Sequence, residues 1–182
     1  MVSRATEEPV EPGHVIPLAT AAGADKFAHH IFDLIHASVE KTKDARIPAT
    51  AFVLMTINPE DGTPFDGVFV GDIEKRSETS EEDFHATVRK IAEAGKAIGV
   101  LFVERFVVLR TNAETMKNAT NLKDVAESKD TTEGRIVFAS FEHVRFSGVR
   151  CWRADIEDES KINEFVSCPH IVVRASFLAF QN

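Results

Sequence analysis

Four side chains that could bind a metal ion recur at helical spacing in the first third of the chain. They occupy positions i, i+4, i+7 and i+11 of a predicted helix, so they lie within about 60° of one another on its surface. Two imidazoles and two carboxylates on one stripe form a ligand set that zinc or another divalent transition metal uses. The stripe lies opposite the apolar face of that helix, so a solvated polar surface is the plainer interpretation. Its members are His29, Asp33, His36 and Glu40.

A second candidate is Glu104, a carboxylate inside an apolar segment. In a strand, Phe102 and Phe106 share its face. A carboxylate buried among aromatic rings costs several kcal/mol unless it is paired or protonated, and its pKa rises toward the range of a general acid or base. The structural alternatives are a strand end that leaves the sheet, or an ion pair with an arginine of a later hairpin such as Arg150 or Arg153. The structural pair is the favoured interpretation.

The two cysteines, Cys151 and Cys168, do not amount to a disulfide framework. Cys151 alternates with Trp152 along a predicted strand, which favours packing in the core. Cys168 precedes Pro169-His170, and a thiol and an imidazole two positions apart seldom meet in space. A catalytic Cys–His pair is therefore not the favoured interpretation.

Other catalytic signals are weak. The sequence contains no GxGxxG, GxxxxGK[ST], GxSxG or HExxH pattern, which argues against nucleotide binding by the usual backbone cradles. His143 could form an acid–base pair with Asp155 or Glu142, but no Ser or Cys nucleophile stands in a recognisable setting. We therefore expect no cofactor.

Composition narrows the function classes further. The 182 residues carry a net charge of −8 and scattered basic residues, which argues against a nucleic-acid surface. No apolar stretch approaches the roughly 18 residues of a membrane span, and no basic start with an apolar run indicates a signal peptide. The sequence predicts a cytoplasmic protein with neither a nucleic-acid nor a membrane partner.

Residues 1–23 are rich in Pro, Glu and Ala, and Pro9, Pro12 and Pro17 would break a helix, which predicts an extended or flexible N-terminal arm (1–23). Hydrophobic periodicity beyond it predicts a single domain (24–182). The domain is expected to be α+β, with a single mostly antiparallel sheet of about six strands and two or three helices packed on it. The predicted elements are a helix from Asp25 to about Lys43, strands 50–57 and 66–73 around a turn at 58–62, a helix from Ser80 to Gly99, strand 100–109, a helix 111–128, a hairpin 135–146 and 149–156, and strand 171–180.

The same periodicity predicts which side chains of the helices face the core. Gly99 is expected to end the second helix, and Thr111 to begin the third. The predicted inward residues are Phe27, Ile31, Leu34, Ile35 and Ser38 of the first helix, Phe84, Val88, Ile91, Ala92 and Ile98 of the second, and Met116, Ala119 and Leu122 of the third.

The order of pieces between residues 47 and 157 carries a resemblance. An Asp61-Gly62 turn precedes the helix 84–98, and the strand after it holds Glu104-Arg105-Phe106. This order resembles a loose group of uncharacterised bacterial and phage-borne α+β proteins, whose corresponding strand ends in a Glu-Ala-Trp-like signature. In the group a later strand begins at an arginine, here Arg135, and an Arg-rich strand returns, here 150–156. The resemblance implies the same fold and a bacterial or phage setting, and it supplies no catalytic residue.

These observations favour a non-enzymatic binding or protein-interaction domain that self-associates into a homo-oligomer. Its edge strands must be covered, and pairing with a second copy is one way to cover them. The alternatives are a small hydrolase or divalent-metal-dependent enzyme that uses the helix stripe or a pocket at Glu104, and a phage or mobile-element structural or host-interaction protein, for which multimers larger than a dimer are expected.

Overall fold

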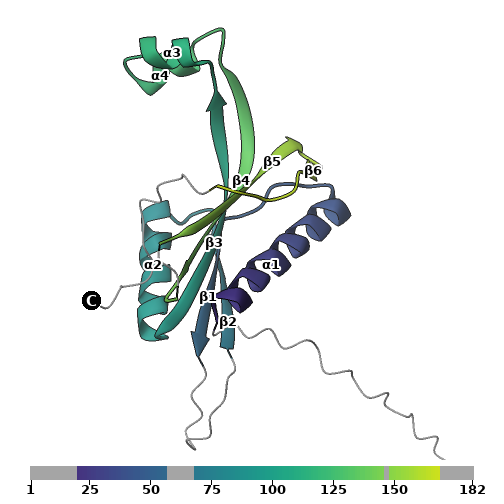
Figure 1. Cartoon of the computed structure of the whole chain (residues 1–182), viewed down its shortest axis with the longest axis vertical. Helices are drawn as coiled ribbons and strands as arrows, with labels where there is room; N and C mark the ends of the chain where they lie inside the picture. Colours follow the sequence, from purple (N-terminus) through teal and green to yellow (C-terminus); the bar gives the residue numbers. More distant parts are fainter. Residues whose placement is uncertain (1–19, 57–67, 146–147, 169–182) are drawn as a thin grey trace, which may run out of the picture.

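A computed structural model of the protein describes residues 20–56, 68–145 and 148–168. The predicted arm up to residue 19, the turn 58–62 and the strand 171–180 lie outside these residues. The predicted α+β fold is confirmed: one antiparallel sheet has the order β2-β1-β3-β4-β5-β6, with β7 paired to β5 (Figure 1). The elements are α1 (Ala21–Thr42), β1 (Thr50–Thr56), β2 (Val68–Glu74), α2 (Glu81–Ala94), β3 (Ala97–Arg110), α3 (Ala113–Asn118), α4 (Leu122–Ala126), β4 (Thr132–His143), β5 (Arg150–Asp158), β6 (Lys161–Ile162) and β7 (Val166–Ser167).

The helix α1 begins four residues before the predicted start. Thr20 is its N-cap, and the hydroxyl oxygen of Thr20 accepts a hydrogen bond from the Gly23 amide at 3.1 Å. Asp25 caps nothing and instead forms an ion pair with Arg150 of β5. The helix ends where predicted, at Lys43, which takes a left-handed conformation with φ 54°.

The buried face of α1 is rotated relative to the predicted face. Phe27 and Ile31 are buried as expected, but Leu34 is 52% exposed. Phe32 and Val39 are buried in its place. The reason is a large aromatic partner: Phe32 packs edge-on against Trp152 of β5, with ring centroids 5.5 Å apart.

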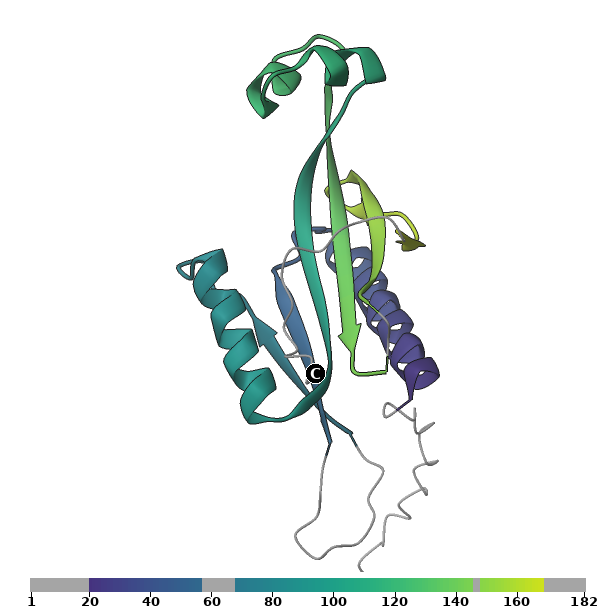
Figure 2. The ribbon, with the colours of Figure 1, turned by 60° about the vertical axis from the view of Figure 1, so that its left-hand side comes forward.

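The strand β3 is the centre of the sheet. It pairs with β1 on one side and with β4 on the other. Residues 99–103 are consecutively buried, as expected for a strand that is covered on both faces. Leu101 and Val103 belong to the core beneath α1, while Val100 and Phe102 belong to the core beneath α2. Figure 2 shows the two helices on opposite sides of the sheet.

The helix α2 begins as predicted and ends earlier than predicted. The hydroxyl oxygen of Ser80 accepts a hydrogen bond from the Asp83 amide at 3.1 Å. The helix ends at Ala94 with Gly95 as its C-cap, and a side chain at position 95 would collide with the sulfur of Met55. Gly99 is therefore not the stop: it lies inside β3, opposite His143 of β4.

The predicted helix 111–128 is wrong. The structure has two short helices there, capped by Asn112 and Asn121, each of whose side chains accepts a backbone amide hydrogen bond. Met116 and Leu122, predicted to face inward, are 59% and 74% exposed. Caps formed by asparagine side chains divide the segment, because these side chains compete with a continuous helix for backbone amides.

The predicted hairpin is confirmed as the antiparallel pair β4–β5. Residues 146 and 147 of its turn lie outside the described residues. Two short strands that the sequence did not predict, β6 and β7, both pair with β5. No helix among the described residues is long and apolar enough to cross a membrane.

Phe141 tests the core beneath α1. Its side chain is fully buried in that cluster, so Phe141→Ala should cost about 3–5 kcal/mol of unfolding free energy through lost transfer energy and the cavity that remains. Urea unfolding measures this cost. Val144→Ala is the control: Val144 is 55% exposed, so its replacement should change stability by no more than about 0.5 kcal/mol. Equal costs for the two variants would contradict the assigned core.

Candidate functional site

The predicted metal stripe does not converge on one point. His29 and Glu40 are eleven residues apart, about 16 Å along α1. The His29 ring lies edge-on to Phe32 and Trp152, and the His36 ring lies edge-on to Phe165 at 5.8 Å. The stripe therefore borders the aromatic packing against β5 rather than lying opposite it. Among the described residues, no three His, Cys, Asp or Glu side chains come close enough to hold a metal ion.

Glu104 is partly buried on the face of β3 that carries Phe102. Burial raises the pKa of its carboxyl, the nearby Glu81 raises it further, and Lys75 lowers it by a smaller amount. The expected ion pair with Arg150 is not formed. Arg150 is opposite Phe141 in the register, which puts its side chain on the other face of the sheet, where it pairs with Asp25.

The second arginine considered, Arg153, lies on the same face as Glu104 but two strands away. Glu104 is opposite Phe138, and Phe138 is opposite Arg153. The ring of Phe138 thus stands between the two charges, and Phe106 packs edge-on against it at 6.0 Å. The electrostatic partners of Glu104 are Glu81 and Lys75, from the α2 side of the sheet.

The predictions from sequence did not include His85, which lies on the same side of the sheet as Glu104. Its ring packs edge-on against Phe102 at 5.1 Å. Burial lowers its pKa, Arg89 lowers it further, and Glu81 opposes that change. Glu81 therefore acts on the protonation of both Glu104 and His85. The spacing i, i+4 between Glu81 and His85 was the available sequence signal.

His143 does not form the acid–base pair considered from the sequence. Its side chain is buried, and its Nδ1 accepts a hydrogen bond from the Arg145 amide at 3.0 Å. Glu142, as its neighbour along a strand, points to the opposite face. Asp155 instead pairs with Arg110 at 2.7 Å. The side chains of His143, Glu142 and Asp155 therefore do not meet at one site.

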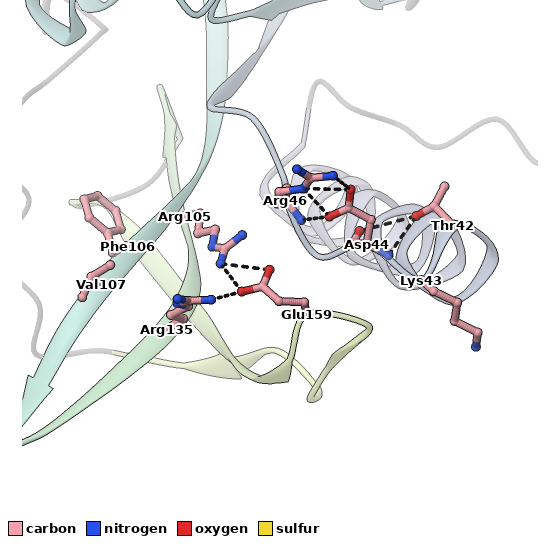
Figure 3. A pocket seen from close by; sticks show the side chains of 9 residues that line it. All are labelled: Thr42, Lys43, Asp44, Arg46, Arg105, Phe106, Val107, Arg135 and Glu159. Atoms are coloured by element: carbon pink, nitrogen blue, oxygen red, sulfur yellow. Dashed lines mark hydrogen bonds and ion pairs between the residues drawn. The ribbon is translucent and has the colours of Figure 1, made fainter.

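An open groove of about 910 Å³ lies between the C-terminal end of α1 and the middle of β3 (Figure 3). It combines four basic and two acidic side chains with two apolar ones, in a protein whose overall charge is −8. We call it the basic groove. Its lining residues are Thr42, Lys43, Asp44, Arg46, Arg105, Phe106, Val107, Arg135 and Glu159.

Both carboxylates of the basic groove are held by arginines. Glu159, between β5 and β6, accepts hydrogen bonds from Arg105 at 2.9 and 3.2 Å and forms an ion pair with Arg135 (Figure 3). Asp44 accepts from the amide and guanidinium of Arg46, and these hydrogen bonds lower its pKa to about 2. The surplus charge of the groove is therefore positive, which suits an anionic surface.

The groove lies where the sheet gives way to a projecting ribbon. Pairing of β1 with β3 ends at Val103, and pairing of β5 with β4 ends at Arg135. Beyond these points, within the part of the chain that the structure describes, β3 and β4 pair only with each other, as far as Arg110 opposite Thr132. We call residues 106–134 the arm, a different segment from the predicted N-terminal arm. The helices α3 and α4 form the tip of the arm, away from α1 and α2 (Figures 1 and 2).

The arm exposes apolar side chains. Seven large hydrophobic residues are exposed among the described residues, and four of them lie on the arm. Phe106 and Val107, at the root, are 42% and 60% exposed, and Met116 and Leu122 lie at the tip. The sequence reading missed this surface because it assigned the tip residues to the core.

No known protein family, curated protein or solved structure matches the chain. The resemblance to bacterial and phage-borne proteins with a Glu-Ala-Trp-like signature therefore stays a hypothesis, and the geometry alone supports the functional argument.

Glu104→Gln separates an unpaired carboxylate from a structural ion pair. A raised pKa means that the folded protein binds the proton more tightly than the unfolded chain, so this contribution to stability is present at low pH and is lost as pH rises through the folded pKa. At pH 7 the neutral amide should therefore be more stable than the wild type, and the difference should shrink near pH 4.5. Thermal unfolding at both pH values measures this.

The matched control is Glu133→Gln, since Glu133 is an exposed carboxylate on the neighbouring strand. Its replacement should change stability little at either pH. A Glu104→Gln variant that is less stable than the wild type at pH 7 would show that the charge has a stabilising partner.

Proposed function

We propose that the protein is a non-enzymatic interaction domain that self-associates, with the arm of a second copy as the partner of its own arm. The observation that carries the proposal is the exposure of Phe106, Val107, Met116 and Leu122 on a ribbon that leaves its own sheet. Exposed apolar side chains at both the root and the tip of one projecting element favour its use as an interface.

The stability of a two-stranded ribbon supports a partner. Such a ribbon is marginally stable in water unless a third strand or another layer covers it. The arm has partial apolar cover, since Phe106 packs on Phe138 and Val125 of α4 is buried. Val107, Met116 and Leu122 nevertheless stay 59–74% exposed. Burying the apolar residues against a second arm would supply the missing cover.

Charge also favours a second copy. The arm carries four basic and five acidic residues, so its net charge is −1, whereas the whole chain carries −8. Two arms can meet without the repulsion that the rest of the surface would impose. A two-fold contact places the same patch on both copies and leaves no patch open for further growth. The surplus positive charge of the basic groove would face the acidic surface of the partner.

Substitutions of the two exposed tip residues test whether the arm mediates self-association. Static light scattering of the untagged chain at tens of micromolar should give the mass of a dimer. Met116→Asp combined with Leu122→Asp should give a monomer, because a charge on each tip residue opposes burial in the interface. Both side chains are already exposed, so the fold should persist, as circular dichroism checks.

The control carries the same change elsewhere. Leu34 on α1 and Val166 on β7 are each 52% exposed and lie off the arm, so Leu34→Asp with Val166→Asp should remain a dimer. A wild-type monomer would contradict the proposal, and so would equal dissociation of the two double variants. A multimer larger than a dimer would favour the structural or host-interaction alternative.

An acid–base enzyme is the second candidate, and the raised pKa of Glu104 favours it. The divalent-metal version depends on His29, Asp33, His36 and Glu40. Native mass spectrometry of the untagged protein separates these alternatives, since a stoichiometric metal or small-molecule adduct would favour an enzyme. A dimer mass without an adduct is the result that the interaction domain requires.

A further inference from the structure

The two cysteines of the chain lie on neighbouring segments of the sheet, Cys151 in β5 and Cys168 directly after β7. Trp152 of β5 is opposite Ser167 of β7, so the next position in this antiparallel register places Cys151 opposite Cys168. The Cys168 amide donates a hydrogen bond to the Cys151 carbonyl at 2.8 Å, which extends the pairing to these two residues. Sixteen residues of sequence separate them, and both thiols are free.

This arrangement has the dimensions of a disulfide. Residues that exchange hydrogen bonds across an antiparallel pair have Cα atoms about 5.5 Å apart, and disulfides join Cα atoms about 4.4–6.8 Å apart. Directly opposed residues also point their side chains to the same face of the sheet. Cys151 is on the face of Ser140 and Phe102, whereas its neighbour Trp152 points into the core beneath α1.

The two thiols differ in exposure. Cys151 is 4% exposed, and burial, with a smaller contribution from Cys168, raises its pKa to about 11. Cys168 is partly exposed at the sheet surface, and its thiol lies 3.6 Å from the Val166 carbonyl oxygen. A reagent therefore reaches Cys168 first, and Cys151 lies behind it as the residue that resolves the product.

We propose that Cys151 and Cys168 form a reversible intramolecular disulfide, a covalent modification site that ties β7 to β5. The oxidant is a low-molecular-weight disulfide. The Cys168 thiolate attacks it, forms a mixed disulfide and releases one small thiolate. The Cys151 thiolate then attacks the Cys168 sulfur and releases the second. One small disulfide and two protein thiols become one protein disulfide and two small thiols, so protons and electrons balance.

The bond would stabilise the folded chain. It closes the loop 151–168 in the unfolded state, which reduces the conformational entropy gained on unfolding. The loop contains the β5–β6 turn with Glu159, so the oxidised form would also restrain one wall of the basic groove. This inference does not depend on the self-association proposed above.

Oxidised glutathione tests the site on the full chain. After incubation, the intact mass should fall by two hydrogen atoms, and a non-reducing digest should contain one linked peptide with both cysteines. The melting temperature should rise by about 5–10 °C and return to its starting value with dithiothreitol. The protein should migrate as a single chain in a non-reducing denaturing gel.

Two variants assign the roles of the thiols. Cys151→Ser should stop at the mixed disulfide and gain the mass of one glutathione, because nothing remains to resolve it. Cys168→Ser should react much more slowly, because the remaining thiol is buried. Wild-type protein that keeps two free thiols, carries two glutathiones or forms disulfide-linked dimers would overturn the proposal.

Discussion

The structure depends on the burial of β3 on both faces. Residues 99–103 lie beneath α1 on one side and α2 on the other, so neither helix could leave without exposing a large apolar surface. This requirement explains why α2 must stop at Gly95: the chain needs to turn at once into the central strand. It also explains why β1 and β4 must both pair with β3, since a central strand in an apolar layer has no water for its amides and carbonyls.

The strands β1 and β5 stop pairing with β3 and β4 at nearly the same level of the sheet. The kinds of side chain at the surface change at this level. Below Val103 the sheet is a two-sided core. Above it, polar and charged side chains appear beside exposed aromatic ones, and the basic groove and the root of the arm coincide. Glu104, at this boundary, is partly desolvated and has no fixed counter-charge from the neighbouring hairpin. The basic groove, the exposed apolar residues at the root of the arm and Glu104 thus all lie at the level where β1 and β5 stop pairing with β3 and β4.

Local sequence signals predicted the parts of the fold whose causes are local. The cap at Ser80, the apolar stretch of β3 and the β4–β5 pairing needed only spacing and residue type. The rotation of α1 was not predictable in this way, because Trp152 draws Phe32 inward from more than a hundred residues along the chain. The prediction that Met116 and Leu122 face the core was wrong for a related reason. The spacing of apolar residues indicates an apolar face of a helix, but it does not show whether another element covers that face. The neighbouring positions of Cys151 and Cys168 also depend on register, which the sequence did not indicate.

Glu159 connects segments that lie far apart in the sequence. It pairs with arginines on both strands of the arm's root, and its backbone carbonyl accepts a hydrogen bond from Ala45, just after α1, at 2.7 Å. Arg105 also donates to the Ala45 carbonyl at 3.4 Å. The root of the arm is therefore joined to the end of α1 through this one carboxylate residue, in addition to the pairing of β3 and β4 with the sheet.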